Sequence, residues 1–279
     1  MRIAIIAAGE MGAGVGARLH AKGAEVVTSL VGRGSGSAER ARHAGMIAID
    51  QDEALVAAAD MVLSILPPAD AVALAQRLAP ALKAAQGKTL YADCNAVAPE
   101  TVKRVAAIVT AAGSRFVDVG IIGGPPRPEG YTPRFYASGE AGNELARLTQ
   151  FGLDIRPVEG GIGAASALKM AYASLTKGFT AIGIASARGA AKGRVAAALQ
   201  AELAESQPHL FAWLQRQIPT VYPKAYRWVG EMEEIARHLG ADPGAQMFAG
   251  AARSYESLAR QWRDGGEEEP GFLADIFRR

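Results

Sequence analysis

The stretch Met1-Arg-Ile-Ala-Ile-Ile-Ala-Ala-Gly-Glu-Met-Gly12 decides the fold of the first half of the chain. Its apolar run predicts a short strand that breaks at a small-residue turn, with a helix from about Met11 to Lys22. The spacing is that of the dinucleotide-binding motif G-x-G-x-x-G, with Ala7 where the first glycine usually stands. In that motif the backbone approaches a pyrophosphate closely, and the helix N-terminus offers the anion N–H groups and a positive dipole end. We therefore expect this turn to bind a dinucleotide through Ala8, Gly9, Glu10, Met11 and Gly12; the alternative is a plain turn whose glycines serve packing.

The composition is that of a folded protein, because 49% of the 279 residues are hydrophobic and 21% are charged. The net charge is +2 with dispersed basic residues, so we expect neither nucleic acid nor a membrane surface as a partner. The single cysteine, Cys94, excludes an internal disulfide and favours a cytoplasmic location. We expect no signal peptide and no membrane-spanning segment. The four histidines are scattered, so no metal site is expected.

Apolar, β-branched runs alternate with alanine-rich helical stretches through the first half of the chain. Strands are expected at 3–7, 25–30, 61–66, 89–92, 116–119 and 135–137, with helices between them, for example at 69–82 and 99–111. This pattern predicts an α/β fold with a Rossmann-type, doubly wound parallel sheet. After Val158 only helical periodicity continues. We therefore expect a dinucleotide-binding domain over residues 1–159 and an all-helical domain over residues 160–279.

The end of the second expected strand indicates which dinucleotide binds. NAD-selective enzymes place an acidic residue there for the ribose 2′-hydroxyl, whereas segment 28–37 contains no acid. It contains Arg33, Ser35 and Ser37 instead, and a guanidinium can bind a 2′-phosphate in a bidentate manner. NADP is therefore expected rather than NAD; the alternative is a flexible loop with an incidental arginine.

Two further strand ends carry candidate residues for the nicotinamide half of the cofactor. Leu66 and Pro67 form a rigid turn after the third long strand, and Asn95 follows the next strand. Ligands of open α/β sheets bind outside the carboxyl ends of the strands, so Asn95 is a candidate contact to the nicotinamide ribose or the substrate. Its alternative role is a side-chain turn or a cap for the following helix.

Gly123 and Gly124 follow a later strand, and their backbone N–H groups are candidates for binding a substrate carboxylate. The alternative is a plain turn before two prolines. Lys169 lies in an otherwise apolar helical segment at the domain junction, with Tyr172 about one turn on. A lysine desolvated there would lose basicity and serve as acid or base. A lysine in such a helix is more often a surface residue with its stem on apolar neighbours, but the junction favours the catalytic role.

Taken in order, these motifs resemble the 3-hydroxyacid dehydrogenase and 6-phosphogluconate dehydrogenase superfamily over the first two-thirds of the chain. The likeness rests on Gly9 to Gly12, Leu66-Pro67, Asp93 to Pro99, Gly123-Gly124 and Lys169. It implies that Lys169 is catalytic, that Ile122, Gly123, Gly124 and Tyr172 bind substrate, and that the helical domains form a homodimer. Ile122 stands where the family usually has serine, and Tyr172 and Ala173 where it has asparagine, so a less polar pocket is expected.

We therefore expect an NADP-dependent oxidoreductase that acts on the hydroxyl or keto group of a small, acidic substrate. An imine reductase-like enzyme and a non-catalytic NADP-binding regulatory protein are the alternatives. The large aromatic residues of the helical half include Trp213, Trp228, Phe248 and Trp262. A helical domain of about 120 residues can bury few side chains of this size, which favours a homodimer through residues 160–279.

Overall fold

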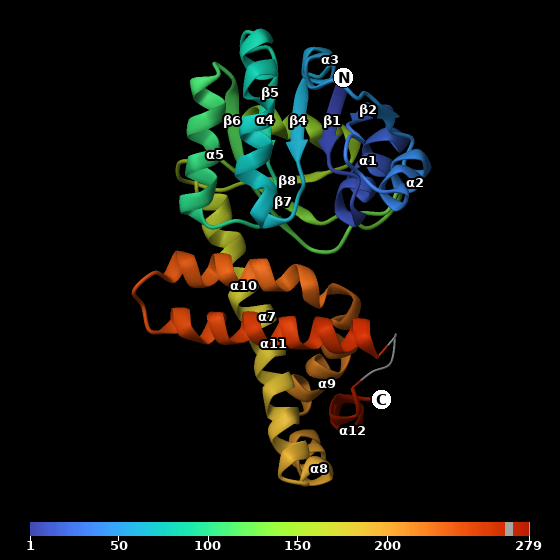
Figure 1. Cartoon of the computed structure of the whole chain (residues 1–279), viewed down its shortest axis with the longest axis vertical. Helices are drawn as coiled ribbons and strands as arrows, with labels where there is room; N and C mark the ends of the chain where they lie inside the picture. The colour runs from blue at the N-terminus through green and yellow to red at the C-terminus, as the bar shows by residue number, and fades with distance from the viewer. Residues whose placement is uncertain (266–269, 279) are drawn as a thin grey trace. The chain divides into compact units, whose positions relative to one another are not determined.

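The computed structural model describes residues 1–265 and 270–278. The chain divides into two compact units, Met1–Lys169 and Met170–Arg279 (Figure 1). This division lies inside helix α7 (Ala164–Lys192), whereas the boundary expected at 159/160 lies in the loop before that helix. Among the described residues, no helix is both long enough and apolar enough to cross a membrane.

The first unit contains one eight-stranded sheet with the order β3-β2-β1-β4-β5-β6-β7-β8. Its strands are β1 (Arg2–Ile6), β2 (Glu25–Thr28), β3 (Ile47–Ala48), β4 (Met61–Ser64), β5 (Leu90–Asp93), β6 (Arg115–Ile122), β7 (Arg134–Ser138) and β8 (Asp154–Pro157). Neighbouring strands are parallel except β6 and β7, which are antiparallel. The expected parallel sheet is confirmed with this one correction. The connection from β6 to β7 is a loop without a helix, so the chain returns in the opposite direction.

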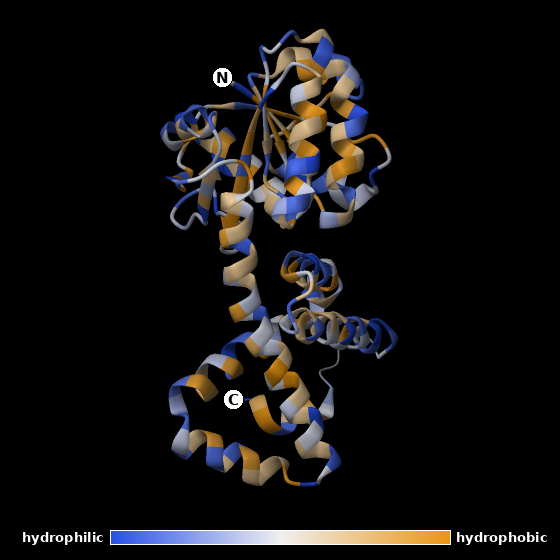
Figure 2. Cartoon of the chain, turned by 90° about the vertical axis from the view of Figure 1, so that its left-hand side faces the viewer, coloured by the Kyte–Doolittle hydropathy of each residue, from blue (hydrophilic) through white to orange (hydrophobic). Residues whose placement is uncertain are grey.

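Helices cover both faces of this sheet, because alternate residues of a strand point to opposite sides. Ile3 and Ile5 of β1 join a core with residues of α1, whereas Ala4 and Ile6 join a second core with residues of α3, α4 and α5. The helices of this unit are α1 (Glu10–Ala21), α2 (Ser35–His43), α3 (Asp52–Ala58), α4 (Ala71–Ala84), α5 (Pro99–Ala111) and α6 (Gly142–Leu145), with short 3₁₀ turns η1 (Pro68–Asp70) and η2 (Ala146–Phe151). Figure 2 shows apolar strands between helices that carry both hydrophilic and hydrophobic residues.

The described part of the second unit consists of helices, as expected. They are the remainder of α7, then α8 (Ala196–Ser206), α9 (Pro208–Gln217), α10 (Ala225–Leu239), α11 (Gly244–Asp264) and α12 (Gly271–Phe277), with 3₁₀ turns η3 (Ile218–Thr220) and η4 (Tyr222–Lys224). Helices α10 and α11 pack along each other (Figure 1).

The three tryptophans of the helical half have aromatic partners within their own unit. The rings of Tyr222 and Trp262 stack with centroids 5.1 Å apart, and Trp228 meets Tyr255 edge-on at 5.2 Å. Trp213 meets Phe179 at 6.5 Å. The large apolar side chains that this unit leaves exposed include Leu175, Phe179, Ile182 and Met247, and none of these is a tryptophan.

Candidate active site

The turn between β1 and α1 has the geometry expected of a dinucleotide motif. A Cβ added at Gly12 would lie 1.9 Å from the carbonyl oxygen of Ala7, so only glycine allows the helix to pack this closely on the strand end. A Cβ at Gly9 would meet no described atom within 4 Å, so the space beside it is open. Gly9 is also the N-cap of α1 and has extended backbone geometry. Gly12 therefore serves packing, while Gly9 leaves room for a ligand at the helix N-terminus.

Helix α2 begins at Ser35, two residues after the exposed Arg33. The sequence reasoning missed Arg40, which is one turn beyond Ser37 on this helix. The Arg40 Nε donates to the carbonyl oxygen of Ala8 at 3.0 Å, and its Nη2 donates to the Ser37 hydroxyl at 3.1 Å. Arg40 thus ties α2 to the turn after β1. Its spacing of three residues from Ser37 was the one signal in the sequence.

The segments around Leu66 and Asn95 meet at the carboxyl ends of β4 and β5. The Asn95 side-chain oxygen accepts a hydrogen bond from the Leu66 N–H at 2.6 Å. Its side-chain nitrogen donates to the Ser64 hydroxyl at 2.8 Å and to Asp93 at 3.1 Å. Asn95 is 3% exposed and holds the Leu66-Pro67 turn against β5. The N-cap of α5 is Ala98 instead, and a contact from Asn95 to the ribose or substrate stays a prediction.

Asp93 is a buried carboxyl beside this turn. It accepts hydrogen bonds from the backbone and side chain of Asn95, and it pairs in register with Asp118 of β6. Burial, assisted by the Asp118 charge, raises the pKa of Asp93 to about 7, although the Asn95 hydrogen bonds favour the ionised form. Burial also raises the pKa of the neighbouring Cys94 thiol.

The loop after β6 is fastened to α1. Arg18 of α1 donates to the carbonyl oxygens of Pro128 at 3.1 Å and Gly152 at 3.0 Å. The Gly124 N–H donates to the hydroxyl of Tyr131 at 3.1 Å, so Tyr131 already occupies one donor expected to bind a substrate carboxylate. Sequence reasoning missed Tyr131, which lies seven residues from its partner along an irregular loop.

The two remaining substrate candidates differ in exposure. Ile122 is the last residue of β6 and is 8% exposed, and its contact with a substrate stays a prediction. Tyr172 lies on α7 in the second unit and is 49% exposed.

Lys169 lies in the first unit, on the part of α7 that packs against β6. A Cβ added at Gly120 would lie 3.1 Å from the Lys169 Cβ and 2.7 Å from the carbonyl oxygen of Ala165. Gly120 lies two residues beyond Asp118, whose partner Asp93 ends β5, so Lys169 is at the carboxyl edge of the parallel strands. Lys169 is half-buried and not fully desolvated, because α7 leaves part of its side chain exposed.

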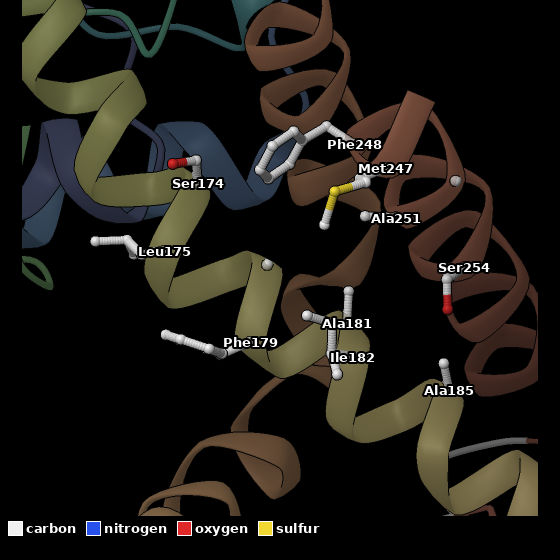
Figure 3. A pocket seen from close by; sticks show the side chains of 12 residues that line it. Ser174, Leu175, Phe179, Ala181, Ile182, Ala185, Met247, Phe248, Ala251 and Ser254 are labelled. Atoms are coloured by element: carbon white, nitrogen blue, oxygen red, sulfur yellow. The ribbon is translucent and has the colours of Figure 1, made fainter. Parts of the chain in front are cut away.

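A separate apolar cavity of about 370 Å³ lies between α7 and α11 in the second unit (Figure 3). Its lining residues include Leu175, Phe179, Ile182, Met247 and Phe248. Lys169 does not line it, and the described residues around it bring no acid or base. This cavity is therefore not our candidate active site.

Residues 2–144 match the family described as the NAD-binding domain of 6-phosphogluconate dehydrogenase, and residues 190–258 match a domain of unknown function, DUF1932. The chain belongs to the 3-hydroxyacid dehydrogenase and 6-phosphogluconate dehydrogenase superfamily. An uncharacterised 28.5 kDa protein of Methanothermus fervidus is 30% identical to this superfamily member over 182 residues, which are 65% of this chain and 68% of that protein.

Solved structures show the same superfamily fold along nearly the whole chain. A conserved protein of unknown function, described as similar to 3-hydroxyacid dehydrogenases, is 27% identical with a TM-score of 0.70, covering 95% of this chain and 99% of that one. The Mycobacterium tuberculosis 3-hydroxyisobutyrate dehydrogenase with L-serine is 22% identical with a TM-score of 0.69, covering 99% and 97%. An imine reductase from Myxococcus stipitatus in complex with NADP⁺ shares the fold at 17% identity and a TM-score of 0.55, covering 100% of both chains. The chain thus has the NAD(P)-binding fold of 3-hydroxyacid dehydrogenases.

Proposed function

We propose that this protein is an NADP-dependent oxidoreductase that interconverts a hydroxyl and a keto group on a small, acidic substrate. The observation that carries the proposal is the position of Lys169 beside Gly120, at the strand edge where the β1–α1 turn also lies. Ligands of open α/β sheets bind at this edge. The dinucleotide-binding turn would hold the cofactor that exchanges hydride, and the amine at the same edge would exchange the proton.

Each part of the site has a defined task in this proposal. Gly9 and the N-terminus of α1 would hold the pyrophosphate, because the space at Gly9 is open. A bound nicotinamide cofactor supplies the acceptor or donor of hydride. The Lys169 amine takes the hydroxyl proton in oxidation and returns it in reduction. Donors of the loop after β6, Gly124 among them, bind the substrate carboxylate once the Tyr131 hydroxyl moves aside.

The preference for NADP is supported by the region after β2. Arg33 is exposed and lies two residues before Ser35, the first residue of α2. A helix N-terminus and a guanidinium together favour a phosphate over the bare ribose hydroxyl.

Substrate screening of the purified protein tests the proposal. Short 3-hydroxyacids with NADP⁺, and their keto acids with NADPH, are followed by NADPH absorbance, with cyclic imines and NADPH as a second panel. We expect turnover in the hydroxyacid and keto-acid panel. Turnover of imines alone would support imine reduction. The observation behind this alternative is the fold that the chain shares with an imine reductase. NADPH binding without turnover in either panel would support a regulatory protein.

We also propose that the protein is a cytoplasmic homodimer formed through the helical unit. The apolar side chains of Leu175, Phe179 and Ile182 are 47–60% exposed along α7, and Met247 of α11 is 64% exposed beside the same cavity (Figure 3). Exposed apolar side chains that gather on one surface can mark an interaction site, and a second copy of the helical unit would cover them. The cytoplasmic location rests on the single buried cysteine, Cys94.

A further inference from the structure

Asp118 of strand β6 is fully buried, and its carboxylate contacts the start of helix α7. It accepts four hydrogen bonds from described residues. Its Oδ1 accepts the Ser166 hydroxyl at 2.6 Å, and its Oδ2 accepts the Gly163 N–H at 2.9 Å and the Ser166 N–H at 3.0 Å. The hydroxyl of Ser138 donates to the same Oδ2 at 3.0 Å. A strand residue of β6 thus binds the N–H groups at the N-terminus of α7, where a negative charge is most favourable.

The same contacts fix where α7 lies on the sheet. Ser138 of β7 accepts the Ala165 N–H at 3.0 Å, so two neighbouring strands hold the first turn of the helix. The backbone of that turn approaches β6 so closely that only glycine fits at Gly120. Lys169 is four residues after Ala165 and three after Ser166, one helical turn beyond the anchored residues. Within the first unit, the Asp118 network and the contact at Gly120 therefore set the position of the Lys169 backbone.

We propose that Asp118 is a positioning residue for Lys169: its carboxylate fastens the first turn of α7 so that the amine is held at the carboxyl edge of the sheet. The proposal rests on the proposed role of Lys169 in proton transfer. Asp118 is 0% exposed and its oxygens already accept four donors, so it acts through the helix and not on the substrate. Small displacements of a reacting group cost large factors in rate, which is how such an anchor affects turnover.

The test compares Asp118→Asn with a matched control, Thr89→Val. Asparagine removes the negative charge at the N-terminus of α7 and replaces one acceptor oxygen by an N–H donor. If the remaining oxygen keeps the N–H groups of Gly163 and Ser166, that donor faces the Ser166 hydroxyl. Thr89 is also buried, and its hydroxyl donates to Val56 and Ala59 near the opposite end of β5, so its loss destabilises the sheet away from α7. Ser166→Ala removes a single donor and serves if Asp118→Asn does not fold.

Two readouts are needed, and one is independent of any substrate. Trace acetylation with acetic anhydride, followed by mass spectrometry, gives the labelling rate of Lys169 relative to the exposed Lys22 of the same molecule. We expect Asp118→Asn to raise this ratio at least about threefold, since opening of the first turn exposes the amine, and Thr89→Val to leave it unchanged. For the best substrate of the screen, kcat falls about 10–10²-fold with the Kd for NADPH unchanged.

Equal labelling ratios and equal kcat in Asp118→Asn and Thr89→Val, at matched loss of thermal stability, would overturn the positioning role. A failure of the proposed function looks different. In that case Lys169→Met keeps its turnover, or the wild type has no substrate in either panel, and the labelling ratio alone decides whether Asp118 positions Lys169.

Discussion

Arg33 is the residue on which the choice between the two dinucleotides depends most directly. We expect Arg33→Ala to weaken NADPH binding by about 1.5–3 kcal/mol, because a charge-assisted contact to the 2′-phosphate is lost. NADH binding should not change. Calorimetric titration of both cofactors measures this, with Arg42→Ala as the control, since Arg42 lies on the same helix and contacts His43. Equal affinity of the wild type for NADH and NADPH would contradict the NADP preference.

Asp93 makes the stability of the first unit depend on pH. Its folded-state pKa of about 7 is above the value of about 3.9 for an unfolded aspartate, so the folded state holds the proton longer. Stability should therefore fall as the pH rises from about 4 to about 7, by at most about 1.4 kcal/mol per pH unit, with no further loss from this group above pH 7.

Asp93→Asn should remove this dependence, whereas the exposed carboxyl variant Glu53→Gln should retain it. Urea unfolding of the three proteins across this pH range measures the difference. Parallel pH profiles for wild type and Asp93→Asn would show that Asp93 titrates normally.

At the scale of elements, most strands of the first unit could be predicted from sequence, because buried parallel strands are continuous apolar runs. The strands β3 and β8 escaped prediction for a physical reason. β3 has two exposed residues, and β8 (Asp154–Pro157) contains an aspartate, an arginine and a proline, as edge strands often do. The strand β7 was expected at 135–137, and only its antiparallel direction escaped prediction, because that direction depends on the loop before the strand and not on its own residues.

The candidate site divides in a similar way. Gly9, Gly12 and Lys169 could be identified because a motif or an unusual neighbourhood marks them locally. Arg40, Tyr131 and the anchoring role of Asp118 could not, because each depends on a contact between segments distant in sequence or on an irregular loop. The sequence shows Asp118 only as a polar residue in a strand, and its four donors come from β7 and the start of α7.

The loop after β6 gives a prediction for an element. Arg18→Met removes the side-chain donors that hold Pro128 and Gly152, so amide exchange of residue 127 and residues 129–131 should accelerate about tenfold or more. Exchange in the β1 core should stay as in the wild type. Arg77→Met, which breaks a surface ion pair with Asp52, is the control. Unchanged loop exchange in Arg18→Met would show that the loop is held by other contacts.

At the scale of the whole molecule, the dimer is the first quantity to measure. Light scattering at low micromolar concentration should give twice the chain mass of 29.0 kDa. We expect an interface beyond roughly 2,000 Å² in total, and a dimer with so large an interface should persist on dilution. Leu175→Glu places a charge at a side chain that is 60% exposed and should yield monomers. Ile47→Glu, at an exposed apolar residue of β3, should remain dimeric. A 29.0 kDa wild-type particle would refute the dimer.

The most direct test of the proposed function is the turnover of Lys169→Met on the best substrate of the screen, measured together with its affinity for NADPH. We predict that kcat falls about 10²–10⁴-fold, the range for a lost general acid or base, while the Kd for NADPH stays within about twofold of the wild type. A variant that retains most of its kcat would contradict the proposed chemistry, and one that loses NADPH binding would assign Lys169 to cofactor binding or folding instead.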